Sequence, residues 1–123
     1  MNVLLDTHVA LWWLDDHPKL LPKYCEIITD TNNLIYVSAA TVWEINIKAG
    51  LGKLVISDTY LDVLRREGFL ELDVNWSHAQ RVGELPAIHS DPFDRLLIAQ
   101  AQIEKLTFLS VDKFVRKYDL QVL

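Results

Sequence analysis

The sequence offers little that would suit a secreted or membrane-bound protein. Its one cysteine, Cys25, cannot form a disulfide within the chain, which agrees with a reducing compartment. The apolar stretch VLLDTHVALWWL at residues 3–14 has no basic flank and is interrupted by Asp6 and His8. It therefore predicts neither a signal peptide nor a membrane-spanning helix. We expect a cytoplasmic protein with no membrane partner.

Positive charge is also scarce. The chain has 12 lysines and arginines against 17 aspartates and glutamates, which gives a net charge of −5. This balance argues against a protein that coats nucleic acid with a basic face. It does not exclude an enzyme that acts on nucleic acid, because clustered carboxylates can hold a metal ion while a few local cations steer the substrate.

Motifs for several common sites are missing. The tract GLGK at residues 50–53 lacks the glycine spacing and the final Ser or Thr of a phosphate-binding loop. No pair of histidines or cysteines has the spacing of a zinc site, and no serine or cysteine has a convincing base partner for covalent catalysis. The four histidines are interpreted as surface residues or as residues behind the direct ligands of a site: His8, His17, His78 and His89.

What the chain does contain is a regular alternation of two kinds of segment. Its 123 residues fit one domain, residues 1–123. Short apolar or β-branched runs predict buried strands at residues 2–5, 34–37, 69–74 and 107–111, with a candidate fifth at 120–123. Helical spacing lies between them, at about residues 7–15, 22–31, 39–50, 58–67, 76–84 and 92–105. Together they predict an α/β fold, a three-layer α/β/α sandwich around a mostly parallel sheet of four or five strands.

Two acidic residues directly follow predicted strands. Asp6 follows NVLL and Asp112 follows TFLSV. Both should lie at the carboxyl edge of the sheet, where open α/β folds form their sites. Either residue could instead cap the helix that comes next, and that alternative stays open for each one taken singly.

Glu44 lies in a largely apolar predicted helix, and its role is open. Lys48 stands four residues later, in the order that favours a helical ion pair. Ala40, Ile47 and Leu51 fall on or near the same stripe of the helix. Their position indicates that Glu44 points along a buried flank rather than into open water.

The segment HSDPFDRLLIAQA, residues 89–101, holds two aspartates at the start of a predicted helix. Pro92 suits the first helical position, which makes Asp91 the N-cap that accepts hydrogen bonds from free backbone N–H groups. Asp94, at the third position, is not needed as a second cap. Its carboxylate is therefore free for another purpose.

Four acids from separate segments are thus predicted to meet at one edge of the sheet: Asp6, Glu44, Asp94 and Asp112. Like charges a few ångströms apart raise one another's pKa or require a cation. Hard oxygen ligands suit Mg²⁺, with Mn²⁺ as its substitute. The sequence therefore predicts a metal site built from carboxylates.

At these residues the chain resembles a known family. Four blocks are similar, in this order, to the successive motifs of VapC-type toxins: LLDTHVALWWL (4–14), VSAATVWEINIKAGLGKL (37–54), HSDPFDRLLIAQA (89–101) and LTFLSVDKF (106–114). These toxins are the PIN-domain ribonucleases of bacterial and archaeal toxin–antitoxin pairs. The resemblance runs from Met1 to the carboxyl terminus and implies a PIN-like form of the predicted sandwich.

The resemblance also implies an activity and the residues that carry it. The four acids of the family match Asp6 in LLDTH, Glu44 in WEI, Asp94 in FDRLLIA and Asp112 in SVDKF. They imply a Mg²⁺- or Mn²⁺-dependent endoribonuclease in which all four are catalytic and metal-binding residues. Asp6 and Asp94 are then the expected direct ligands, and the other two complete the set directly or through water. Ser110 keeps a hydroxyl where the family often has Thr, so activity is expected.

Three partners follow from the same resemblance: an RNA substrate, a cognate antitoxin lying across the acidic cleft, and a second copy of the chain in a homodimer. The segment VALWWL, residues 9–14, is apolar on every side, which suits burial between two layers or contact with another chain. Six cations are candidates for gripping RNA, although a solvated surface charge is the better interpretation of each: Lys48, Lys53, Arg65, Arg66, Arg95 and Lys113.

Two other functions stay open. A PIN-like domain without activity could serve only to bind its partner, although all four acids are present. A phosphorelay receiver domain would fit the length, the charge and the α/β alternation. It would need a phosphoacceptor aspartate after a central mid-chain strand and a lysine after a late strand. Asp73 and Asp112 fit those positions poorly.

Overall fold

The centre of the molecule is a four-stranded parallel sheet, seen in a computed structural model that describes residues 1–123. The strands are β1 (Asn2–Leu5), β2 (Leu34–Ser38), β3 (Leu70–Leu72) and β4 (Thr107–Leu109), in the order β3-β2-β1-β4. Every pairing between neighbouring strands is parallel. The predicted α/β class and the parallel sheet are confirmed.

The candidate fifth strand at residues 120–123 is wrong. Val122 forms one isolated parallel bridge with Phe108, and no strand develops around it. The chain between β4 and this bridge contains a 3-10 turn, η1 (Val115–Lys117), that the sequence did not predict. Only the last few residues therefore run beside β4, which is too short for a ladder.

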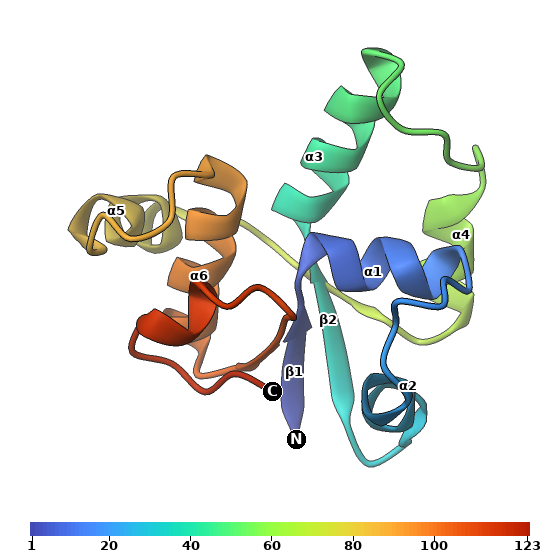
Figure 1. The fold of residues 1–123 in the computed structure, drawn as a ribbon, viewed down its shortest axis with the longest axis horizontal. Helices are drawn as coiled ribbons and strands as arrows, with labels where there is room; N and C mark the ends of the chain where they lie inside the picture. Colours follow the sequence, from blue (N-terminus) through green and yellow to red (C-terminus); the bar gives the residue numbers. More distant parts are fainter.

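Six helices cover the sheet. They are α1 (Thr7–Leu14), α2 (Pro22–Thr29), α3 (Ala39–Gly50), α4 (Tyr60–Arg66), α5 (Trp76–Glu84) and α6 (Pro92–Glu104). Figure 1 shows α5 and α6 on one side of the strands and α1, α2 and α4 on the other, which gives the predicted three layers. The predicted ends of strands and helices differ from the observed ends by at most two residues.

The side chains of β1 divide the apolar core into two halves. Val3 and Leu5 pack into the cluster on one face of the sheet, and Leu4 packs into the cluster on the other. All three are fully buried, which stabilises the fold by about 1.5–3 kcal/mol for each side chain. Because both faces are covered, β1 is apolar along its whole length instead of alternating with polar residues.

The strand order fixes where a site can form. From β1 the chain moves outward through β2 to β3, and then returns to place β4 on the other side of β1. The order therefore reverses between β1 and β4, and the crevice at a reversal lies beyond the carboxyl ends of the strands. The backbone N–H of Asp6 donates to the carbonyl of Leu109 at 3.1 Å, so the two strand ends are level there.

The two tryptophans of α1 are each partly covered by the chain itself. Trp13 donates from its ring nitrogen to Glu67 and lies edge-on against Phe69. Trp12 stacks on His17. The all-round apolar character of α1 is thus explained in large part by contacts within the chain. None of the helices combines the length and the apolar character that crossing a membrane requires.

Candidate metal centre

Asp6 follows β1 and has no structural task at the helix it precedes. It occupies the N-cap position of α1, yet its side chain makes no capping hydrogen bond. The residue is only 3% exposed; its Oδ2 accepts a 2.6 Å hydrogen bond from the Ser110 hydroxyl, and its Oδ1 has no partner. Burial raises the pKa of Asp6, the Ser110 hydroxyl opposes that rise, and the charge of Asp112 adds to it.

Asp112 is linked to Asp6 by hydrogen bonds to the hydroxyl of one residue, Ser110. Its backbone N–H donates to the Ser110 hydroxyl oxygen at 3.1 Å, so one hydroxyl joins the segments after β1 and β4. The Oδ1 atom of Asp112 accepts from the backbone N–H of Phe114 at 2.9 Å. That oxygen closes a local turn before η1, whose N-cap is Phe114, so the helix-capping alternative for Asp112 is wrong; the other oxygen faces the site.

Glu44 forms the ion pair with Lys48 and is also buried, so both interpretations of this residue hold. Its Oε2 accepts from Lys48 Nζ at 2.6 Å, as the spacing predicts. The residue is nevertheless only 2% exposed, and its Oε1 is buried without a partner. The hydrogen bond to Glu44 raises the pKa of Lys48. One oxygen of Glu44 is therefore held by a cation and the other is free.

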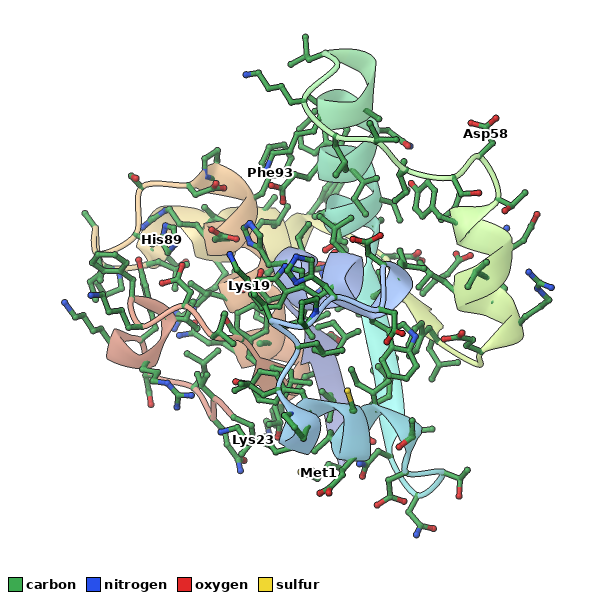
Figure 2. The ribbon with its side chains drawn as sticks, turned by 45° about the vertical axis from the view of Figure 1, so that its right-hand side comes forward. Met1, Lys19, Lys23, Asp58, His89 and Phe93 are labelled. Carbon is green, nitrogen blue, oxygen red and sulfur yellow. The ribbon has the colours of Figure 1, made fainter.

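A contact between two aromatic rings brings Glu44 near Asp94. Trp43 on α3 and Phe93 on α6 meet edge to face, with 5.0 Å between ring centroids. Figure 2 shows Phe93 at the start of α6, facing α3. Since each ring belongs to the residue before one of the acids, this packing brings the two acidic segments together.

The two aspartates at the start of α6 have different environments. Asp91 is the N-cap: its Oδ1 accepts from the backbone N–H groups of Phe93 at 2.8 Å and Asp94 at 3.2 Å. The capping prediction for Asp91 is confirmed. The Asp94 side chain caps nothing, and it is only 14% exposed.

The pKa of Asp94 depends on the other acids that lie around it. Burial is the largest cause that raises its pKa, to about 7. The negative charges of Asp6, Asp91 and Glu44 add to the rise, whereas a positive charge on His89 acts against it. The side chains of Asp6, Glu44 and Asp94 therefore lie within electrostatic range of one another, and Asp112 is connected to Asp94 through His89.

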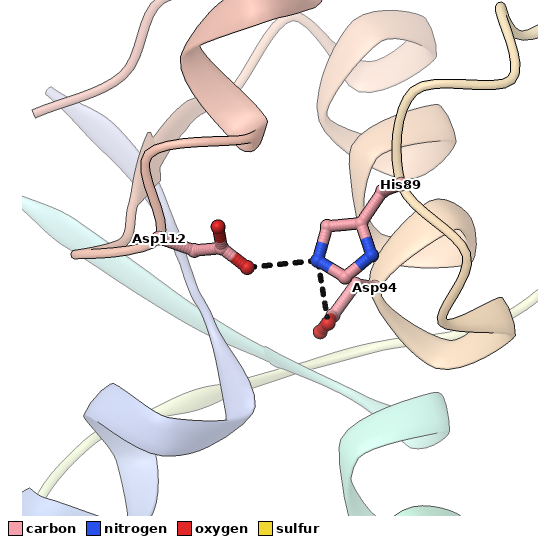
Figure 3. Close-up of side chains that lie close together, drawn as sticks. All are labelled: His89, Asp94 and Asp112. Atoms are coloured by element: carbon pink, nitrogen blue, oxygen red, sulfur yellow. Dashed lines mark hydrogen bonds and ion pairs between the residues drawn. The ribbon is translucent and has the colours of Figure 1, made fainter.

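His89 lies between two of these acids (Figure 3). Its Nε2 is 2.7 Å from Asp112 Oδ2 and 3.2 Å from Asp94 Oδ2. The ring is only 12% exposed, so the surface interpretation of His89 is wrong. The ring is held next to the cap of α6, because its Nδ1 accepts from the Asp91 backbone N–H at 3.1 Å.

His78 is a second correction. It is 1% exposed, so the surface alternative is wrong, and it makes no contact with the acids that would place it behind a ligand. The reason is a capping box at the start of α5, in which Asn75 accepts from the His78 backbone and the His78 ring accepts from the Asn75 backbone. The ring is used in folding and forms no hydrogen bond or ion pair with the four acids.

Arg95 is the third correction, since it is neither a solvated charge nor available to a substrate. Its guanidinium donates to the backbone carbonyls of Val82 and Pro86, each at 2.9 Å, and of Leu85 at 3.3 Å. These bonds hold the segment that connects α5 to α6. Arg65, by contrast, is exposed and paired with Asp62 and Glu71, as expected for a surface charge.

The residues present fit a divalent metal ion of the magnesium type. The acids offer only oxygen ligands, and two of those oxygens, Asp6 Oδ1 and Glu44 Oε1, are buried without any hydrogen-bond partner. A buried carboxylate oxygen without a donor costs free energy unless a cation or water meets it. Oxygen ligands in this number suit Mg²⁺ or Mn²⁺ better than zinc.

Comparison with known proteins agrees with this architecture. The model of the family described as PIN domain matches residues 3–120. VapBC2 from Rickettsia felis, solved with a DNA fragment from its promoter, has a chain 19% identical with a TM-score of 0.77, covering 100% of this chain and 98% of that one. DNA-bound VapBC from Salmonella typhimurium gives 15% identity and a TM-score of 0.70, covering 100% and 97%.

A third solved structure, VapBC-1 from nontypeable Haemophilus influenzae, gives 19% identity and a TM-score of 0.68, with the same coverage of 100% and 97%. No curated protein is significantly similar to the chain in sequence. At these identities the solved structures establish a shared fold over the whole chain.

Proposed function

Because the chain belongs to the PIN domain family, we propose that it is a VapC-type toxin that acts in the cytoplasm as a metal-dependent endoribonuclease. The observation that carries the proposal is the pair of buried carboxylate oxygens, Asp6 Oδ1 and Glu44 Oε1, that no protein donor meets. They lie at the edge of the sheet where the strand order reverses, beside two further acids. Such an excess of acceptors is expected where a cation belongs.

Asp6 and Asp94 are the proposed direct ligands of Mg²⁺ or Mn²⁺, and Glu44 and Asp112 complete the set directly or through water. The cation, when bound, stabilises the charge that develops on the phosphate and on the attacking and leaving oxygens during hydrolysis of the RNA phosphodiester. All four acids count as catalytic in this proposal. No side-chain nucleophile takes part.

The residues around the acids orient them. The Ser110 hydroxyl holds Oδ2 of Asp6, which leaves Oδ1 for the site. Lys48 holds Oε2 of Glu44 in the same manner, which leaves Oε1. Ligands fixed by hydrogen bonds lose less freedom when a cation binds, so these two contacts favour binding.

The proposed partners are an RNA substrate, a cognate antitoxin and a second copy of the chain. The solved relatives named VapBC support the antitoxin, and a basic antitoxin segment would complement the acidic site. Trp43 and Ile47 on α3 and Leu51 at its C-cap recur every four residues and are 59%, 37% and 64% exposed, which supports a homodimer contact there. Sedimentation should give a dimer for the wild type and a monomer for Trp43→Glu.

Cleavage of RNA by the purified protein, free of antitoxin, tests the proposed activity. We expect cutting with Mg²⁺ or Mn²⁺ and none with EDTA. Asp6→Asn and Asp94→Asn should abolish it, whereas Asp91→Asn, the same change one turn from Asp94, should retain it because Asn caps a helix as well as Asp does. A folded Asp94→Asn protein that cuts normally would overturn the assignment. If the folded wild type cuts no RNA, the chain is instead a PIN-like domain that binds its partner and has no catalytic activity.

A further inference from the structure

His89 has the position of a metal ligand. One ligand atom from each of His89, Asp94 and Asp112 lies within 4.8 Å of the others. A neutral imidazole nitrogen can bind a metal only through its free lone pair, so the protonation of the two ring nitrogens decides whether His89 is a ligand or a donor.

The nitrogen that faces away from the acids fixes the tautomer. Nδ1 accepts a hydrogen bond from the Asp91 backbone N–H at 3.1 Å. A nitrogen that accepts carries no proton, so the proton of the neutral ring is on Nε2. Binding a metal through Nε2 would move that proton to Nδ1, where it would face the Asp91 N–H and break the contact.

From this geometry we propose that His89 is a positioning residue that donates to Asp112, and not a metal ligand. The metal concerned is the one in the proposed nuclease function, on which the inference rests. Nε2 carries one proton, and Asp112 Oδ2 at 2.7 Å is nearer to it than Asp94 Oδ2 at 3.2 Å. Asp112 takes the hydrogen bond, and Asp94 keeps its carboxylate for the cation.

The surroundings of His89 hold it in this orientation. Its backbone N–H donates to the Tyr118 hydroxyl at 2.7 Å, and its ring lies edge-on against Phe114 at 5.9 Å between centroids. The backbone N–H of Phe114 donates to the other oxygen of Asp112. Each oxygen of Asp112 thus has a protein donor, which distinguishes this acid from Asp6 and Glu44, each of which keeps one oxygen without a partner.

Nitrogen NMR of the ¹⁵N-labelled wild type tests the tautomer directly. Long-range proton–nitrogen spectra distinguish Nε2, which couples to both ring protons, from Nδ1, and show which one is protonated. At a pH where the ring is neutral, we expect its proton on Nε2 and a bare Nδ1 in the metal-free protein, unchanged after Mg²⁺ is added. A proton on Nδ1 in the metal-free protein, or its appearance there with Mg²⁺, would overturn the proposal.

Calorimetric titration with Mn²⁺ tests the positioning role without reference to activity. His89→Phe keeps a ring against Phe114 and removes the donor, and it should weaken Mn²⁺ binding by about tenfold, the lower end for groups that orient metal ligands. His89→Gln offers an amide N–H in place of the ring N–H and should restore most of the affinity. Unchanged binding by a folded His89→Phe protein contradicts the role.

His17 provides the matched control. Its Nδ1 also accepts from the backbone N–H two residues on, that of Lys19 at 3.0 Å, but its ring contacts no carboxylate. His17→Phe should leave Mn²⁺ binding unchanged. A wild type that binds no Mn²⁺ would count against the proposed nuclease, while the NMR spectrum of the metal-free protein would still decide the tautomer. If His89→Phe does not fold, that spectrum and His89→Gln carry the test.

Discussion

Two clusters of polar side chains lie in or beside the core, and they differ in the balance of donors and acceptors. In the first, the Ser38 hydroxyl donates to Gln100 Oε1 at 2.6 Å, and Gln100 Nε2 donates to the Asp73 carbonyl at 3.1 Å and contacts His78 Nδ1 at 3.3 Å. The Nε2 atom of His78 is 3.5 Å from a carboxylate oxygen of Glu104. One atom of this cluster, that Nε2, is buried without a hydrogen-bond partner, and its neighbour is an acceptor.

The acidic cluster has an excess of acceptors. Its four carboxylates meet few donors, and Asp6 Oδ1 and Glu44 Oε1 remain buried with none. In the first cluster the unpaired atom is a nitrogen beside a carboxylate, whereas in the acidic cluster both unpaired atoms are acceptors, which cost stability until a cation or water meets them. The kind of unpaired atom therefore distinguishes the two clusters without reference to the family.

The largest expected effect comes from Asp6→Asn. It keeps the shape of the side chain and removes one of the proposed direct ligands, so RNA cleavage should fall by more than about 100-fold, beyond the usual loss for groups behind the ligands. In EDTA the variant should unfold at a higher temperature than the wild type, because burial and Asp112 disfavour the charge on Asp6. A variant that is less stable than the wild type in EDTA would contradict this account of Asp6.

The pH dependence of stability should follow Asp94. Its pKa is about 7 in the folded protein against 3.8 for the ordinary side chain, so folding favours the protonated form. The resulting stability is full below about pH 4 and is lost as pH rises through 7, a change of about 4 kcal/mol at most. Urea unfolding without metal should show this loss in the wild type and not in Asp94→Asn.

Added Mg²⁺ should reverse that loss above pH 7. A cation that binds only the folded state stabilises it by about 2.7 kcal/mol at 100 times its dissociation constant. Equal pH profiles for the wild type and Asp94→Asn, or no effect of Mg²⁺ on the wild type, would show that Asp94 does not carry the charge that the site must neutralise.

Gln100→Leu tests the first cluster. The change leaves the Asp73 carbonyl without its Gln100 donor and the Ser38 hydroxyl without its acceptor, and it should cost about 2 kcal/mol of unfolding free energy in a urea titration. Mn²⁺ affinity should stay unchanged, because Gln100 forms no hydrogen bond with an acid of the site. A loss of Mn²⁺ binding in the folded variant would mean that the two clusters are coupled.

The smallest effect is expected at Asp91. Asp91→Ala removes the N-cap of α6 and should cost about 1 kcal/mol, while Asp91→Asn should restore most of it because its amide oxygen also caps. Thermal unfolding of the two variants measures the difference. Equal destabilisation by both would show that the charge of Asp91, not its cap, matters for stability.

Most of the architecture follows from patterns within a few residues of each other. The alternation of apolar runs with helical spacing predicts the sheet and its helices, and the proline after Asp91 predicts the cap. The acids after β1 and β4 could be placed because the carboxyl ends of parallel strands share one edge. These inferences need only local sequence and a topological rule.

The parts that could not be predicted depend on the paths of connecting segments. Arg95 reaches backbone carbonyls of the segment between α5 and α6, and backbone acceptors leave no trace in a sequence. His89 contacts Asp112, which lies 23 residues later in the chain, and the sequence near either residue does not predict the contact. The carboxyl-terminal run was apolar enough for a strand, but the chain bends after η1, and only one isolated bridge to β4 forms there.

The central claim is that the carboxylates at this edge of the sheet hold a divalent cation. Anomalous diffraction from crystals grown with saturating Mn²⁺ measures it directly. The account predicts a peak in coordination distance of Asp6 and Asp94, with the ring of His89 turned toward Asp112. A well-ordered crystal with no peak at these acids, or with a peak bound to His89 Nε2, would contradict it.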